Sequence, residues 1–286
     1  MGPIKKYKVN LSPSASEIWQ ALIKWAPVEL AESWDNIGLQ VGDPALRVKR
    51  ILVALDPTEA LLKEAERKDV QMVITHHPLI FSPIRSVDLS HQIPRLLAGF
   101  LRSNIVLFAA HTNLDSAKGG VSDMVAGSLG LCGVRPLVVS AHGDPATGIG
   151  RVGRLARPTA LSVVASSLLS LLSAPDCLMT GNLSQPIKKI AICCGSGSDL
   201  WPYVIASGAE LFISAEIKHH IARDAEERGI AIIDAGHFYT ERPIVFEIMR
   251  FLRQWADKMS WVLELYTFDA EGPPLRRMDG PLKISV

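Results

Sequence analysis

The sequence has no excess of charge of either sign, and this argues against partners that are bound through charge alone. Lysine and arginine together number 30 and aspartate and glutamate 29, giving a formal net charge of +1 over 286 residues. Nonspecific nucleic-acid binding depends on clustered cations that neutralise phosphates. The one short basic cluster, Lys5-Lys6-Lys8, is too small to supply them. We therefore do not expect nucleic acid as a partner.

Long apolar segments are also missing. The amino-terminal residues lack the apolar core of a secretory signal, and Lys6 stands where the myristoylation pattern requires serine or threonine. The longest uncharged run, Thr159 to Pro175, is rich in serine and short for a membrane span. These absences predict a cytoplasmic protein without membrane association.

Paired cysteines and the common nucleotide and nucleophile motifs are absent as well. None of the 4 cysteines forms a C-x-x-C pair, so neither a disulfide framework nor a zinc ribbon is expected. The adjacent Cys193-Cys194 could ligate a soft metal ion, but buried positions at a strand end are the more frequent role. Without a Walker lysine motif, a nucleophile elbow or a Rossmann fingerprint after the first strand, ATP-driven transfer, serine hydrolysis and nicotinamide chemistry are disfavoured.

What the sequence does contain is an alternation of apolar runs and amphipathic segments. A hydrophobic content of 48% is enough to bury a large core. We expect strands over residues 51–55, 72–75 and 105–110, separated by helices over 58–68 and 93–103. This order indicates an α/β fold with largely parallel sheets flanked by helices.

The second half of the chain repeats this plan. Three segments match without internal gaps: residues 49–53 match 188–192, residues 69–75 match 208–214, and residues 105–111 match 231–237. The duplication predicts two pseudo-symmetric lobes whose corresponding strand ends face a shared cleft. We place the first half at residues 1–131, a connecting segment at 132–187 and the second half at 188–286.

Polar side chains gather where these strands end. His76-His77 follows one strand, and two further strands each end on a histidine followed four residues later by a carboxylate, namely His111 with Asp115 and His237 with Glu241. Open α/β sheets place their ligands at the carboxyl ends of strands. A lone histidine there is usually an ordinary polar residue, but four histidines and two acids in a repeated pattern favour a metal site.

The mixture of imidazoles and carboxylates suits zinc, iron or manganese and does not resemble a calcium site. Two ions in one site lie about 3.5–4 Å apart, and a carboxylate with two oxygens can bridge them. We expect two divalent metal ions. Glu241 is the better candidate bridge because its side chain is longer, although Asp115 also has two oxygens. Three roles are open to His111: metal ligand, support for a ligand, or proton transfer beside the metals.

Four other features also have an ordinary structural explanation. Gly195-Ser196-Gly197 could hold an anion but is more typical of a tight turn, and His219-His220 fits a solvated helix face. Glu216 occupies the repeat position of His77 and could reach the cleft. Trp34 could line a pocket, whereas the neighbouring Asp35-Asn36 fits an Asx turn.

Together these residues resemble the NIF-three-like family, also called the YbgI-like or GTP cyclohydrolase I type 2 group. The resemblance rests on five motifs: Trp34-Asp35-Asn36-x-Gly38, Ile74-Thr75-His76-His77-Pro78, His111-Thr112-Asn113-x-Asp115, Gly195-Ser196-Gly197 and Asp234-Ala235-Gly236-His237-x-x-Thr240-Glu241. One stretch departs from the family pattern: Ser214-Ala215-Glu216-Ile217-Lys218-His219-His220 stands where relatives usually have Thr-Gly-Asp-x-Lys-Tyr-His.

The resemblance implies a two-lobed subunit with a dinuclear metal centre between the lobes. It also implies assembly into a ring-shaped homohexamer built from dimers. The metal ligands that it implies are His76, His77, Asp115, His237 and Glu241, with Glu241 bridging and His111 beside the metals. The departure leaves these ligands untouched but changes backbone freedom and side-chain reach near them.

Two functions follow as hypotheses. The first is a metal-dependent hydrolase, in which the ions activate water and polarise the bond attacked, while His111 is the catalytic residue that relays a proton. The resemblance suggests a purine nucleotide as the small-molecule substrate, opened in a reaction of the GTP cyclohydrolase kind; a phosphoester or a cyclic amide fits equally well. The second is a noncatalytic metal-binding regulatory or scaffold protein that acts through protein partners.

Overall fold

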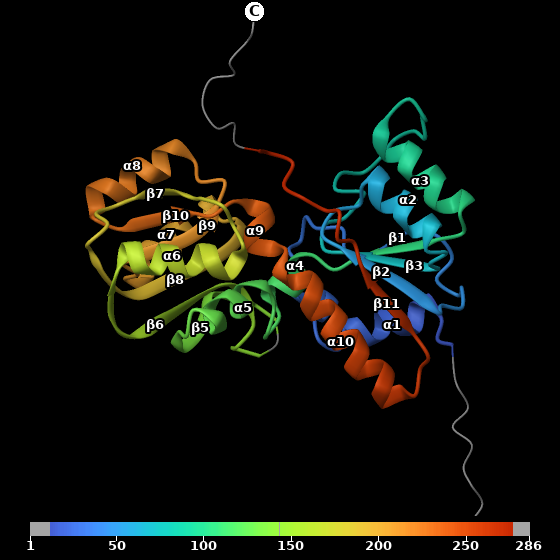
Figure 1. Cartoon of the computed structure of the whole chain (residues 1–286), viewed down its shortest axis with the longest axis horizontal. Coiled ribbons are helices and arrows are strands. Elements are labelled where there is room, and N and C mark those ends of the chain that lie inside the picture. The colour runs from blue at the N-terminus through green and yellow to red at the C-terminus, as the bar shows by residue number, and fades with distance from the viewer. Residues whose placement is uncertain (1–11, 143, 277–286) are drawn as a thin grey trace, which may run out of the picture.

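The computed structural model describes residues 12–142 and 144–276, which form two α/β lobes (Figure 1). The cluster Lys5-Lys6-Lys8 lies outside the described residues. The first lobe is built on a five-stranded sheet in the order β1 (Gly38–Val41), β4 (Val106–Ala109), β3 (Met72–Thr75), β2 (Arg50–Ala54) and β11 (Glu264–Thr267). The last four of these strands are parallel, and β1 joins β4 antiparallel.

The second lobe is built on a six-stranded sheet. Its order is β5 (Cys132–Val139), β6 (Gly148–Ala160), β8 (Pro186–Ser196), β9 (Leu211–Ala215), β10 (Ala231–Asp234) and β7 (Leu178–Thr180). Strands β8, β9 and β10 form a parallel core. Strand β6 pairs with β8, and β7 pairs with β10, both in the antiparallel direction. Strands β5, β6 and β7 all come from residues 132–187, so this segment helps to build the second sheet.

Ten α-helices are described in these residues. They are α1 (Ala15–Leu22), α2 (Glu59–Arg67), α3 (Gln92–Arg102), α4 (Thr112–Ser116), α5 (Val121–Ser128), α6 (Leu161–Leu172), α7 (Trp201–Ser207), α8 (His219–Arg228), α9 (His237–Glu241) and α10 (Pro243–Met259). No helix in the described ranges is long and apolar enough to cross a membrane. The two-lobed α/β architecture predicted from the sequence is confirmed.

The duplicated pattern in the sequence corresponds to duplicated strand pairing. In the first sheet Ile51 pairs with Met72, and in the second sheet the matching residues Ile190 and Leu211 pair in the same way. The parallel cores of the two lobes therefore share one register over their first two strands. Matching residues therefore occupy equivalent positions in the two sheets, as pseudo-symmetric lobes require.

The third strands depart from the expected match by one residue. The Ala110 amide donates to the neighbouring strand of its lobe, and the Ala235 amide makes the corresponding bond in the other lobe (3.0 and 3.1 Å). Ala110 therefore corresponds to Ala235, whereas the sequence match pairs it with Gly236, so that match is wrong by one position. Gly236 is the additional residue, and its φ of 83° turns the chain immediately before His237.

One apolar cluster extends through both lobes. Alternate strand residues contribute to it, with Ile51 and Ile74 from the first sheet and Ile190 and Ile213 from the second. Helix α10 lies between the lobes (Figure 1) and adds its own buried face to the same cluster. Helices α2 and α3 cover the outer face of the first sheet, and α7 and α8 that of the second. Packing on both faces explains why the central strands are apolar throughout.

Candidate metal centre

The six predicted site residues all lie where parallel strands end. His76-His77 follows β3, while His111 precedes α4, which contains Asp115. His237 begins α9 and Glu241 ends it. His237 and Glu241 both belong to α9 and are four residues apart, a spacing that places two side chains on the same side of a helix. His111 and Asp115 have the same spacing, but His111 lies just outside α4 as its N-cap.

Glu241 brings side chains of the two lobes together. Its Oε2 atom lies 2.9 Å from Nε2 of His77, in the first lobe, and 2.9 Å from Nε2 of His237, in the second. Its Oε1 atom lies 4.0 Å from Nε2 of His76. The carboxylate therefore faces three imidazoles, two of which come from the opposite lobe.

Asp115 and His111 complete the cluster from the first lobe. Oδ1 of Asp115 lies 3.6 Å from Nε2 of His76. The ring of His111 packs edge-on against those of His76 and His77, with centroids 5.2 and 5.5 Å apart. Two overlapping groups have the compactness that a metal ion needs: His76 with His77 and His111, and His77 with His237 and Glu241.

All four imidazoles are anchored through the same ring atom. The acceptors facing Nδ1 are Ala110 O for His76 (2.8 Å), Asp56 Oδ1 for His77 (2.8 Å), Asp35 Oδ1 for His111 (2.9 Å) and Glu216 Oε1 for His237 (2.9 Å). Because an oxygen acceptor requires a proton on Nδ1, each ring in its neutral form presents the Nε2 lone pair toward the cluster. Metal-ligating histidines are oriented in this way by their outer partners.

Three inward-facing atoms lack the hydrogen bonds that buried polar atoms normally make. Nε2 of His76, Nε2 of His237 and Oε2 of Glu241 are buried, and none has a hydrogen-bond partner of acceptable geometry among the described residues. The short distances to Oε2 therefore bring these groups close without satisfying them. Since an unsatisfied buried donor or acceptor costs about 1–3 kcal/mol, a cation that accepts these lone pairs fits the cluster.

Electrostatic coupling within the cluster shifts its pKa values strongly. Burial acts to raise the pKa of Glu241, but the imidazoles of His237 and His77 outweigh it and hold the pKa below its usual range. Burial and the charge of Glu241 together raise the pKa of Asp115 to about 7. In the metal-free protein, protons on His77 and His237 balance the negative charge of Glu241. A bound cation would take over this role.

The histidines themselves divide by environment. Burial lowers the pKa of His76 to about 3, so that its ring is neutral. Burial also acts to lower the pKa of His77, but Asp56 and Glu241 reverse this and raise it to about 10. For His237 the Glu241 carboxylate likewise overcomes burial and raises the pKa to about 9.

The position of Glu241 depends on a glycine. An added Cβ at Gly195 would lie 2.0 Å from Oε1 of Glu241 and 3.3 Å from Nε2 of His237. Its φ of 68° is also a conformation that favours glycine. The Gly195-Ser196-Gly197 motif therefore leaves space for the carboxylate, with Gly195 and Ser196 at the end of β8 and Gly197 just before a short 3-10 helix.

The sequence did not identify two of the three acids that support the rings, Asp35 and Asp56. Asp35 anchors His111 and also accepts from the Thr112 amide (3.0 Å), beyond the Asx turn expected of it. Asp56 follows β2 directly, and this strand-end position was its only signal. Glu216 reaches His237, as its repeat position suggested, with a side chain that is 60% exposed and a backbone φ of 54°.

The remaining candidates lie away from the cluster or in the core. His219-His220 is exposed at the start of α8, as a solvated helix face requires. Cys193-Cys194 is buried near the end of β8, and both are free thiols. Burial raises the pKa of each thiol well above its ordinary value, so neither is a reactive thiolate.

Two exposed aromatic rings flank the cluster on its solvent side. Trp34 is 55% exposed and Phe81 is 57% exposed. The Trp34 ring lies 5.6 Å from that of Phe81 and meets the His111 ring edge-on at 6.0 Å. Asn36 donates to Ile80 O (2.7 Å) and so joins the two loops that carry these aromatics.

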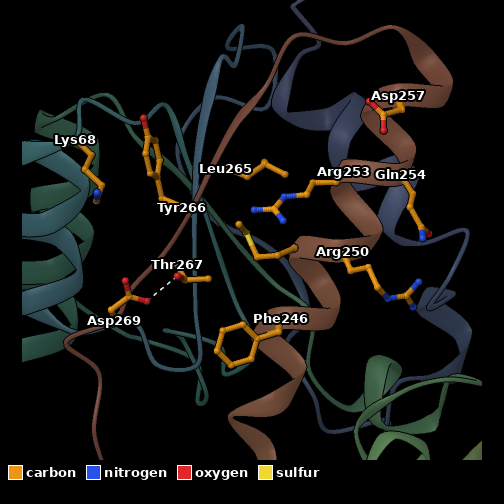
Figure 2. Close-up of a pocket in the computed structure, with 11 residues that line it drawn as sticks. Lys68, Phe246, Arg250, Arg253, Gln254, Asp257, Leu265, Tyr266, Thr267 and Asp269 are labelled. Carbon is orange, nitrogen blue, oxygen red and sulfur yellow. Dashed lines mark hydrogen bonds between the residues drawn. The ribbon is translucent and has the colours of Figure 1, made fainter.

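A separate pocket of about 660 Å³ lies between α10 and β11 (Figure 2). Lys68, Tyr266 and Arg253 line it together with other residues of α10 and the β11 segment. Among the described residues that line it, none belongs to the histidine cluster. We therefore do not connect this pocket with the candidate metal centre.

Similarity to known proteins extends over both lobes. The model of the family Duf34/NIF3 (NGG1p interacting factor 3) matches residues 13–274. A Clostridium perfringens protein named GTP cyclohydrolase 1 type 2 homolog is 35% identical over 233 residues, which cover 81% of this chain and 88% of that protein. NIF3-like protein 1 of Drosophila melanogaster is 32% identical over 231 residues, covering 79% of this chain and 77% of that protein.

A solved structure supports the fold. The crystal structure of a Bacillus cereus protein related to NIF3 superposes with a TM-score of 0.87 at 20% identity, covering 94% of this chain and 100% of that one.

Proposed function

The chain belongs to the Duf34/NIF3 family, and from this premise we propose that it binds two divalent metal ions between its lobes and uses them to hydrolyse a small molecule. The main support is the common orientation of the four imidazoles. Each is held at Nδ1 and presents Nε2 to the cluster, where buried atoms lack partners. This donor set suits zinc, iron or manganese.

The proposed ligands are His76, His77, Asp115, His237 and Glu241. Glu241 is the proposed bridge because its two oxygens face different imidazoles, Oε1 toward His76 and Oε2 toward His77 and His237. Asp115 lies close to His76, so we place these two residues on the same side of the cluster.

His111 is the proposed catalytic proton carrier. Asp35 holds its Nδ1 atom, so Nε2 is the atom available to exchange a proton with substrate. Bound divalent ions would supply Lewis acidity, which activates water near neutral pH and polarises the bond to be cleaved. The chain itself orients the substrate and keeps His111 in place.

A purine nucleotide is the proposed substrate class. Relatives carry the name GTP cyclohydrolase 1 type 2 homolog, and the exposed rings of Trp34 and Phe81 provide a surface on which a planar base can stack. Phosphoesters and cyclic amides remain chemically compatible with the same centre. Product analysis with GTP distinguishes among these.

Elemental analysis is the decisive experiment for the metal centre. We expect about two divalent ions per subunit in freshly purified protein and a clear loss in a His76→Ala variant. Two ions together with no reaction toward GTP would preserve the metal site and reject the cyclohydrolase activity. Absence of metal from the wild type would overturn the proposal as a whole.

An interaction role is the second candidate, and the loop before α3 favours it. Ile84, Val87 and Leu89 are 38%, 66% and 49% exposed, an arrangement typical of a surface that another protein covers. A second copy of this chain in a homohexameric ring is the proposed occupant. Light scattering on the wild type and on a Val87→Asp variant tests this, since a monomeric wild type contradicts it.

A further inference from the structure

Glu271 connects the carboxyl-terminal segment to the end of β2. Its side chain is only 4% exposed. The Leu55 amide donates to Oε1 and Oε2 (both 3.0 Å), and the Asp56 amide donates to Oε1 (2.7 Å). The regular ladder between β2 and β11 ends just before this point, where the Phe268 amide donates to Val53 O (3.0 Å). The carboxylate therefore continues the ladder as an acceptor.

One of the two amides held by Glu271 belongs to Asp56, the residue that supports a proposed metal ligand. Asp56 accepts from His77 at Nδ1 (2.8 Å), and His77 in turn faces Glu241. Any shift of the Leu55-Asp56 peptide would move the acceptor that fixes the His77 ring. Outer partners of this kind set both the orientation and the basicity of a ligating imidazole.

The same carboxylate also faces the chain beside the proposed bridge. Nε of Arg242 lies 3.6 Å from Oε2 of Glu271, and Arg242 directly follows Glu241. Arg242 also donates to Phe268 O (3.3 Å). One buried acid thus contacts the backbone behind His77 on one side and the guanidinium next to Glu241 on the other.

We propose that Glu271 is a positioning residue that keeps the His77 side and the Glu241 side of the cluster at the separation that two metal ions need. The inference rests on the proposed metal-binding function. Removing the charge leaves two buried amides and a guanidinium with a weaker acceptor. The metal affinity then decreases without any change in the ligands themselves.

The test compares Glu271→Gln with Glu264→Gln. Glu264 is exposed on the same segment, and its carboxylate accepts from the Tyr266 hydroxyl, so it is a matched control. Zn²⁺ and Mn²⁺ affinities are measured by chelator competition, with thermal unfolding of the metal-free proteins in parallel. We expect roughly a tenfold or greater loss of affinity in Glu271→Gln and no change in Glu264→Gln.

A double-mutant cycle with Asp56→Asn separates positioning from general stability. If Glu271 acts through Asp56 and His77, the two substitutions together weaken metal binding by much less than the product of their separate effects. Fully multiplicative losses, or a Glu271→Gln variant that binds metal like the wild type, would overturn the inference and leave the metal centre standing. Failure of the wild type to bind metal would overturn the proposed function and this inference with it.

Discussion

Nε2 of His77 and Oε2 of Glu241 lie 2.9 Å apart, although one follows a strand of the first lobe and the other ends a helix of the second. The contact joins the end of β3 in one lobe to α9 in the other, and the parallel cores of the two lobes share one register over their first two strands. His77 is anchored by Asp56, and Glu241 fits against Gly195. The proposed centre is therefore a product of both lobes.

Removing the charge of Glu241 tests the bridge. In Glu241→Gln one carboxylate oxygen becomes an amide nitrogen, which can neither accept a hydrogen bond nor bind a metal ion. We expect bound metal to fall from about two ions to about one or fewer per subunit, as measured by elemental analysis. Glu247→Gln, on the neighbouring α10, is the control because Glu247 pairs only with Arg250 among the described residues. Full metal content in Glu241→Gln would exclude it as the bridge.

The supports behind the rings should influence metal affinity without touching metal. Glu216→Gln keeps the side-chain shape but weakens the acceptor that holds His237. Substitution of such outer partners typically lowers metal affinity by roughly 10–100-fold. Glu226→Gln on the exposed face of α8 should leave the Zn²⁺ affinity unaltered. Equal affinities in both variants, measured by chelator competition, would show that this support is dispensable.

Crowding at Gly195 can be separated from backbone strain. Gly195→Ala places a methyl group against Glu241, and Gly229→Ala imposes nearly the same positive φ (68° and 69°) where no atom lies within 4 Å. Both variants should lose stability, by about 1–3 kcal/mol for the strained conformation. We expect only Gly195→Ala to lose metal as well. Denaturant titration and metal analysis of the two variants provide the comparison.

A rise in pH should lower the stability of the metal-free protein and raise its affinity for metal. The pKa values of His77 and His237, about 10 and about 9, lie above the ordinary 6.5. Their protonated forms stabilise the metal-free fold below pH 6.5, and this contribution disappears as the pH rises through the two folded values. Ligation requires the unprotonated rings, so the affinity for Mn²⁺ rises over the same interval.

Thermal unfolding with and without Mn²⁺ measures both effects. Between pH 6.5 and pH 9 the metal-free Tm should fall, and the increase in Tm caused by Mn²⁺ should grow. An increase that shrinks as the pH rises would mean that these two rings do not take part in metal binding.

Trp34 tests the proposed substrate class. Stacking of a base on an aromatic ring contributes about 1–3 kcal/mol, so Trp34→Ala should weaken GTP binding by about 5- to 150-fold. Trp34→Phe should retain most of the affinity, and inorganic triphosphate should bind all three proteins alike. Calorimetric titration of the metal-loaded proteins gives these values. Equal GTP affinity in Trp34→Ala and the wild type would remove Trp34 from the binding surface.

The fold and the cluster were predictable because they depend on local patterns. Apolar strands alternating with helices determine the α/β architecture, and His76 and His111 could be expected to converge because carboxyl ends of parallel strands meet at one edge of a sheet. His237 follows a strand of the other sheet. The internal repeat then indicated that two such edges face each other. The ligand assignment itself stays a prediction until metal is measured.

Except for Glu216, to which the internal repeat pointed, the supporting residues were not predictable, because each is defined by a distant contact. Asp35 reaches His111, and Glu271 reaches Leu55, across segments whose local patterns give no sign of the partner. The alignment error before His237 has a similar origin. The residue that shifts the register, Gly236, lies in a turn where no hydrophobic period constrains the alignment.

The apolar cluster that runs through both lobes has a consequence for how the molecule unfolds. Because α10 and the inner faces of both sheets belong to one buried cluster, a half-length fragment would leave a large apolar face in water. The two halves should therefore melt together in a single cooperative transition, and a fragment ending near residue 131 should aggregate.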